Sequence, residues 1–163
     1  MIQLDRSGVT GADDVLVERL SHRFAQDQVV RLPGLVPPDI MARLAARLER
    51  GAWRAFGHHD IGEEVILDDA PALHLLHFLV NTPAFLACVQ RIAQAEPLAN
   101  FIGRVYRFVP SAGHSDSWHD DVKDGRAVGL SINLGSRAYA GGVFQIRRKG
   151  SSQLLAEAPN VVA

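Results

Sequence analysis

The residues with the clearest capacity for chemistry lie between Gly113 and Asp121, where two histidines and three aspartates come close together. His119 and Asp121 are two positions apart, so on a β-strand their side chains would project to one face, with roots about 6 to 7 Å apart. Asp120 would point to the opposite face. An imidazole and a carboxylate are two of the three ligands in the 2-His-1-carboxylate triad that binds Fe(II). The spacing predicts a metal site at His119 and Asp121.

Two other interpretations of this segment stay open. His114 and Asp116 have the same spacing, and with His119 they form a His-x-Asp-x-x-His set that could hold Zn²⁺ in a hydrolase. Gly113 and the two serines favour a loop there, whose geometry is harder to fix than that of a strand. A chain with seven histidines and 18 acidic residues also contains such pairs by chance, in which case the segment is a solvated turn.

The elements that must position this segment change in kind near residue 98. Up to that point helical periods dominate: Leu16, Leu20 and Phe24 recur every four residues after Asp13, as in an amphipathic helix. Further helices are predicted to begin at Pro37-Pro38, at Pro71 and at Thr82-Pro83. One short strand is predicted over residues 29–32. We therefore expect residues 1–98 to form a helical buttress.

Residues 99–163 show extended patterns and are predicted to form strands. Phe101 to Phe108 is rich in β-branched and aromatic residues. Residues 128–134 alternate strictly between apolar and polar, which places Asn133 on the polar face. Further strands are predicted over 143–147 and 152–155, joined by a Lys149-Gly150 turn. Helices followed by strands predict a single α+β domain in which the helices pack on an antiparallel sheet or barrel.

Composition restricts the class of protein. A chain of 163 residues that is 47% hydrophobic can bury one substantial core. Its net charge of -1, from mixed acidic and basic residues, argues against a nucleic acid or a membrane as the main partner. The lone Cys88 is expected to be a buried free thiol in a reducing compartment. No signal-peptide pattern or long apolar run occurs, so we expect a cytoplasmic protein.

The region from about residue 100 to 147 resembles the 2-oxoglutarate and Fe(II)-dependent oxygenases of the prolyl-4-hydroxylase-like group. It shares with that family, in the same order, a tyrosine-bearing strand at Tyr106, the pair His119 and Asp121, a strand ending near Asn133, and a strand after Gly141-Gly142. The resemblance implies a double-stranded β-helix, or jelly-roll barrel, with the N-terminal helices packed on it.

The resemblance also implies a function. It predicts a dioxygenase that hydroxylates a small molecule, an amino acid or a protein side chain. The expected cofactor is Fe(II), the expected cosubstrate is 2-oxoglutarate, and ascorbate is an optional further cofactor. His119 and Asp121 become the expected iron ligands, and an aspartate at 121 favours hydroxylation over halogenation. Tyr106 and Asn133 become expected residues of the 2-oxoglutarate pocket. A packed strand tyrosine and a structural amide are the alternatives for these two.

The chain departs from the family pattern after Asp121. The family's third iron ligand is a later histidine, followed by an arginine or lysine that binds 2-oxoglutarate, and no histidine follows His119. Residues 122–163 suffice for about four strands of five to six residues, so a barrel that starts near Phe101 does not close. We expect a fragment that is inactive alone; a natural truncation and a barrel completed by a partner chain are alternatives. A non-catalytic jelly-roll binding module is the alternative function.

Overall fold

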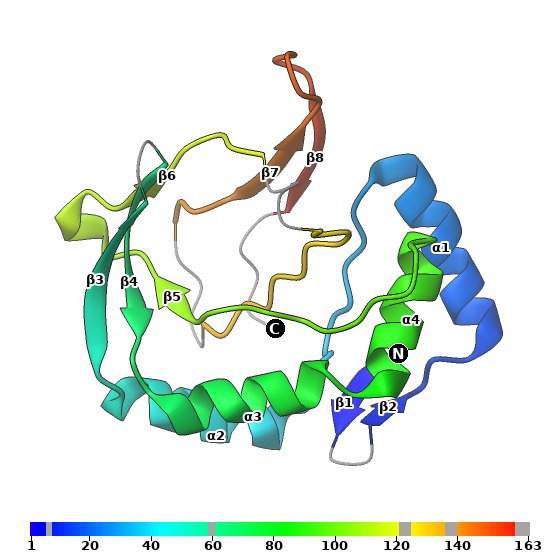
Figure 1. Ribbon diagram of the computed structural model, residues 1–163, viewed down its shortest axis with the longest axis horizontal. Helices are drawn as coiled ribbons and strands as arrows, with labels where there is room; N and C mark the ends of the chain where they lie inside the picture. Colours follow the sequence, from blue (N-terminus) through cyan, green and yellow to red (C-terminus); the bar gives the residue numbers. More distant parts are fainter. Residues whose placement is uncertain (6–7, 59–60, 121–124, 136–139, 159–163) are drawn as a thin grey trace.

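The fold combines four helices with small antiparallel sheets (Figure 1). The computed structural model describes residues 1–163 except 6–7, 59–60, 121–124, 136–139 and 159–163. In chain order the elements are β1 (Gln3–Asp5), β2 (Gly8–Thr10), α1 (Asp14–Asp27), α2 (Pro38–Arg50), β3 (Trp53–His58), β4 (Gly62–Leu67), α3 (Ala70–Val80), α4 (Pro83–Ala93), β5 (Tyr106–Arg107), the 3-10 turn η1 (Pro110–Ala112), β6 (Ser115–Asp116), β7 (Phe144–Arg147) and β8 (Leu154–Ala158). The predicted α+β class is confirmed, whereas the described residues form no closed barrel or jelly roll.

The four predicted helices are all present, and three of them begin at side-chain caps. Asp13, Asp69 and Thr82 each accept a hydrogen bond from the backbone N–H three residues later, at 2.8, 3.0 and 3.3 Å. Such caps satisfy N–H groups that have no partner within the helix. The remaining helix, α2, begins at Pro38, a residue suited to the first helical turn. Helix starts were predictable because these signals are local in the sequence.

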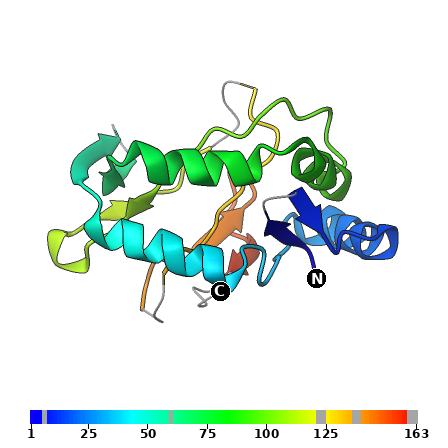
Figure 2. The same cartoon turned by 90° about the horizontal axis from the view of Figure 1, so that it is seen from below.

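The N-terminal region is not purely helical, which corrects the predicted buttress. A β1–β2 hairpin lies beside α3 and α4, and a longer β3–β4 hairpin connects α2 to α3, which contact each other (Figures 1 and 2). β4 is the central strand of its sheet. Its first half pairs with β6 and its second half pairs with β5, while β3 occupies the other edge. This double pairing brings residues from after position 100 against the N-terminal region.

Two clusters of buried side chains stabilise the N-terminal region. One joins the β1–β2 hairpin to α1, α3 and α4 around Phe85, and the other joins α2, β4 and α3 around Leu44. Cys88 lies in the first cluster, and the predicted burial of its thiol is confirmed. Desolvation by burial raises the pKa of this thiol. Ile132, from the C-terminal region, packs against both clusters.

Three predicted strands need correction. Residues 29–32 are not a strand, and of Phe101 to Phe108 only Tyr106–Arg107 pairs. Residues 128–134 alternate in burial up to Ile132 as predicted, with Leu130 and Ile132 packed on the core, yet they pair with none of the strands that the structure describes. The apolar alternation predicted correctly which side chains point inward. Pairing also needs a neighbouring strand in the right register.

The predicted C-terminal hairpin is confirmed: β7 pairs with β8, from Phe144 opposite Ala158 to Arg147 opposite Leu154, with a turn at Lys149-Gly150. Among the described residues no single helix is long and apolar enough to cross a membrane. The bent pair α3 and α4 meets that criterion only when both helices are taken together.

Candidate functional site

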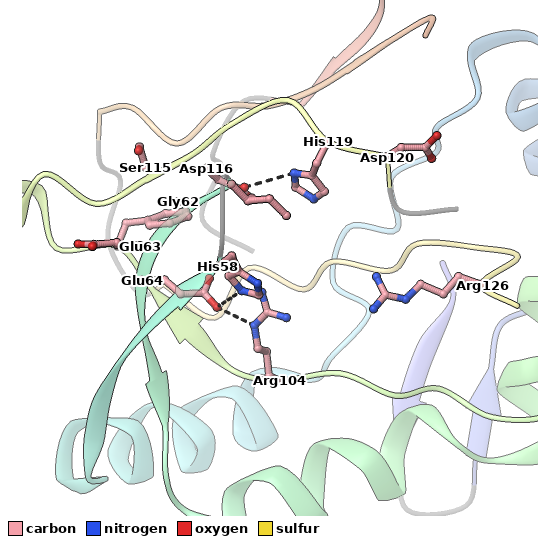
Figure 3. Close-up of a pocket in the computed structure, with 12 residues that line it drawn as sticks. His58, Gly62, Glu63, Glu64, Arg104, Ser115, Asp116, His119, Asp120 and Arg126 are labelled. Atoms are coloured by element: carbon pink, nitrogen blue, oxygen red, sulfur yellow. Dashed lines mark hydrogen bonds and ion pairs between the residues drawn. The ribbon is translucent and has the colours of Figure 1, made fainter. Parts of the chain in front are cut away.

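A polar pocket of about 180 Å³ lies against the first half of β4 (Figure 3). Ser115, Asp116 and His119, from β6 and the segment after it, line one wall. His58, Glu64 and Arg104 line the wall that faces them. The pocket therefore stands where the C-terminal region meets the β3–β4 hairpin.

Gly62 allows the two walls to approach. It pairs with Asp116 across the β4–β6 ladder, and a Cβ at Gly62 would collide with the backbone of Ser115. Only glycine, which lacks a Cβ, permits this approach. The backbone N–H of Ser117 continues the contact by donating to the carbonyl oxygen of Ile61 at 2.9 Å. His119 is held beside β4 as a result.

The ring of His119 points into the pocket (Figure 3). Its Nδ1 lies 2.8 Å from the carbonyl oxygen of Ser117 and 3.3 Å from Oδ1 of Asp116. A carbonyl oxygen can only accept, so Nδ1 carries the proton and the neutral ring has its lone pair on Nε2. Metal-binding histidines commonly use this arrangement, in which the nitrogen that does not bind metal donates to a carbonyl.

The described residues do not make a complete metal site. No group of three histidine, cysteine, aspartate or glutamate side chains in this part of the chain could hold a metal ion. Asp121, the predicted second ligand, lies outside the described residues. His119 is the one predicted metal ligand that the described residues place in the pocket, and its convergence with Asp121 stays a prediction.

The alternative zinc set is not brought together. Nδ1 of His114 accepts a hydrogen bond from the backbone N–H of Val109 at 3.1 Å, and His114 does not line the pocket. Asp116 and His119 are neighbours, but the three residues do not form a group that could hold a metal. His114 instead stabilises the turn around η1.

The wall opposite His119 contains an ion pair that the sequence analysis missed. Glu64 is only 5% exposed, and its Oε1 accepts from Nε of Arg104 at 2.7 Å. Nη2 of Arg104 lies 2.8 Å from Nε2 of His58. Because a guanidinium can only donate, this nitrogen of His58 accepts. The one sequence signal for this ion pair was the position of Glu64. It lies two residues before Ile66, so both side chains are on the same, buried face of β4.

The two predicted 2-oxoglutarate residues do not line the pocket. Tyr106 is 44% exposed, and its ring packs edge-on against Phe108 at 5.6 Å. Oδ1 of Asn133 accepts from the backbone N–H of Gly135 at 2.9 Å. The role of Tyr106 and Asn133 in a 2-oxoglutarate pocket therefore stays a prediction, as do the alternatives of a packed strand tyrosine and a structural amide.

The β7–β8 hairpin reaches the same rim. The guanidinium of Arg147 lies 4.1 Å from the ring centre of Trp118, and Nζ of Lys149 lies 2.8 Å from Oδ2 of Asp120. The hydrogen bond to Asp120 raises the pKa of Lys149. These two contacts connect the hairpin to the segment that carries His119.

Comparison with protein-family models, curated proteins and solved structures found no match for this chain. The function is therefore argued from its own residues.

Proposed function

We propose that this chain is part of a non-haem Fe(II) and 2-oxoglutarate-dependent dioxygenase that hydroxylates its substrate, with His119 and Asp121 as two iron ligands. The observation that carries the proposal is the state of His119. Its ring faces a polar pocket, and its Nδ1 is held by the carbonyl oxygen of Ser117, which leaves Nε2 as the nitrogen able to bind a metal.

The ordered motifs around residues 100–147 support iron rather than zinc chemistry. The fold that we propose together with this function is a jelly-roll barrel. Bound Fe(II) would activate O2, the oxidant of the hydroxylation, and 2-oxoglutarate would be the co-reductant, oxidised to succinate and CO2. The residues of this chain hold and orient the imidazole: the carbonyl oxygen of Ser117 fixes its tautomer, and Oδ1 of Asp116 lies 3.3 Å from Nδ1. The Gly62 contact keeps the segment against β4.

The proposal assigns two iron ligands to this sequence, His119 and Asp121, and no histidine follows His119. One imidazole and one carboxylate would hold Fe(II) with only two protein ligands. We expect the 163-residue chain to bind Fe(II) weakly and to show no turnover.

Metal binding tests the proposal directly. Anaerobic titration of the chain with Fe(II), followed by line broadening of backbone NMR signals, is expected to broaden residues around His119. His119→Ala and Asp121→Asn are each expected to remove this localised effect. His114→Ala is the matched control, because His114 lies in the same segment but outside the pocket. Unchanged broadening in His119→Ala would overturn the proposal, whereas turnover by this chain alone would contradict only the expected inactivity of a site with two protein ligands.

A non-catalytic binding module is the second candidate function. The observation in its favour is the cluster of Glu64, Arg104 and His58, whose polar contacts are all made by protein side chains. Carboxylate binding by a chain that shows no localised iron binding would favour this candidate.

A further inference from the structure

We propose that Arg104 binds the carboxylate group of a small ligand in the pocket, opposite His119. The guanidinium is part of the pocket wall and its side chain is 45% exposed, whereas the carboxylate that anchors it is 5% exposed. An arginine anchored from behind and open in front is arranged to bind an anion.

The orientation of Arg104 is set before any ligand arrives. Nε donates to the buried Glu64 at 2.7 Å, and Nη2 donates to His58 at 2.8 Å. The rings of Phe56 and Tyr106 lie 5.8 and 5.5 Å from the guanidinium carbon. A guanidinium held in this way loses little conformational freedom when it binds a second partner.

Arg104 retains donors for a ligand. A guanidinium has five N–H bonds, and the contacts to Glu64 and His58 use two of them. The other three have no hydrogen-bond acceptor among the described residues. Two parallel N–H groups match the two oxygens of a carboxylate, and this geometry favours a planar carboxylate over a spherical anion.

Four carboxylates and two guanidinium groups line the pocket, so an anionic ligand would be bound locally at a guanidinium and not by the net charge of the lining. Asp116 lies beside His119, and Asp120 is paired with Lys149 at 2.8 Å. Glu63 is solvent-exposed at the rim. Arg126, whose guanidinium also points into the pocket, adds a second positive group (Figure 3).

The volume limits the ligand to a small molecule or a single side chain. An engineered cavity of about 150 Å³ holds benzene, so about 180 Å³ holds a carboxylic acid of a few carbon atoms. That carboxylate could belong to 2-oxoglutarate or to the substrate. The choice between these sources rests on the proposed function, whereas carboxylate binding at Arg104 does not.

The metal-free 163-residue chain can be titrated with glutarate, butyrate and inorganic phosphate and followed by NMR shifts of residues 58, 64 and 104. We expect glutarate or butyrate to bind in the millimolar range and phosphate to bind more weakly. The double variant Glu64→Gln/Arg104→Gln removes both charges, so that no buried carboxylate is left unpaired. It is expected to weaken binding by about tenfold or more, since a hydrogen bond to a charged group is lost.

Arg107→Gln is the matched control, because Arg107 is also an exposed arginine on this segment but stacks on Trp53 at 4.2 Å, outside the pocket. The affinity of the Arg107→Gln variant for glutarate is expected to stay within about twofold of that of the original chain. Arg104→Lys, which keeps the charge but loses the paired donors, is expected to bind with intermediate affinity. Unchanged affinity in a folded double variant, or tighter binding of phosphate than of glutarate, would overturn the proposal.

Titration with 2-oxoglutarate in the presence of Fe(II) separates the two sources. If the double variant weakens 2-oxoglutarate binding, the carboxylate belongs to the cosubstrate. If the double variant weakens only the binding of glutarate and butyrate, the carboxylate belongs to the substrate. Loss of localised iron binding with metal-free carboxylate binding intact would count against the proposed function alone.

Discussion

The part of the chain up to Val105 and the part after it differ in how they are packed. Every buried apolar side chain that the structure describes lies at or before Val105. After it, Trp118, Phe144 and Leu154 are 47, 52 and 43% exposed. Burial of apolar surface is the main source of stability, so the N-terminal part stabilises the fold while the C-terminal part depends on it.

The pocket crosses this division. His58 and Glu64 come from the packed part, whereas Asp116 and His119 come from the exposed part. The arrangement of the site therefore depends on the pairing of β4 with β6 and on the docking of the β7–β8 hairpin, and not on the core alone. The difference between the two parts can be tested by matched substitutions in each.

Phe85→Ala is expected to have the largest effect. Phe85 is 1% exposed in the first core cluster, and loss of a buried phenylalanine costs about 3 to 5 kcal/mol. Phe144→Ala, at a 52% exposed phenylalanine of β7, is expected to cost less than about 1 kcal/mol. Urea unfolding gives both free energies. Similar losses of unfolding free energy in the two variants would contradict the difference in packing between the two parts of the chain.

Gly62→Ala tests the junction. Its Cβ would collide with the backbone of Ser115, and such overpacking costs about 1 to 3 kcal/mol unless β6 moves away. We expect NMR shift changes in residues 113–120 and weaker metal binding at His119. Gly57→Ala is the control, because a Cβ there meets nothing within 4 Å. If both variants leave residues 113–120 unchanged, β6 does not depend on Gly62.

The contact of Arg147 with Trp118 is expected to contribute less. A cation over an exposed aromatic ring stabilises by about 0.5 to 1 kcal/mol, measured as the coupling energy in a double-mutant cycle of Arg147→Ala and Trp118→Ala. Zero coupling would show that the hairpin is positioned by other contacts.

Asp69 offers a smaller, pH-dependent effect inside the packed part. The hydrogen bond from the backbone of Ala72, with the nearby Arg47, lowers the pKa of Asp69 below its ordinary value of 3.8. A lowered pKa in the folded state gives stability that is complete above pH 3.8 and lost as pH falls through the folded pKa. Asp69→Asn keeps an acceptor oxygen but cannot ionise.

The melting temperature of Asp69→Asn should therefore lie below that of the original chain at pH 6, and the gap should close in more acidic solution. Thermal unfolding followed by circular dichroism measures this gap, with Asp68→Asn at the adjacent exposed position as the control. A difference in melting temperature that widens on acidification would contradict the lowered pKa of Asp69.

How much could be predicted from the sequence follows from the distance over which each signal acts. The helices were predicted because Asp13, Thr82 and the apolar periods lie within a few residues of the backbone they organise. The β3–β4 hairpin was missed because residues 53–67 lack a regular alternation. Residues 128–134 show the converse case: their alternation predicted most of the inward side chains, but none of the described strands pairs with them.

The site divides in the same way. His119 was recognised from local spacing and does line a pocket. The opposite wall was not recognised, because Glu64 and Arg104 are 40 residues apart and carry no motif. Nothing in either local stretch indicates that the two will meet.

The sequence by itself determined the helices, the apolar faces and a histidine with metal-ligand chemistry, since each depends on neighbours along the chain. Only the tertiary structure decided that Gly62 admits β6 against β4, that His119 faces Arg104 across a pocket, and that Tyr106 and Asn133 lie outside it. The physical reason is that strand pairing and ion pairs between distant residues are selected by the packing of the whole chain, and their energies are absent from any short segment.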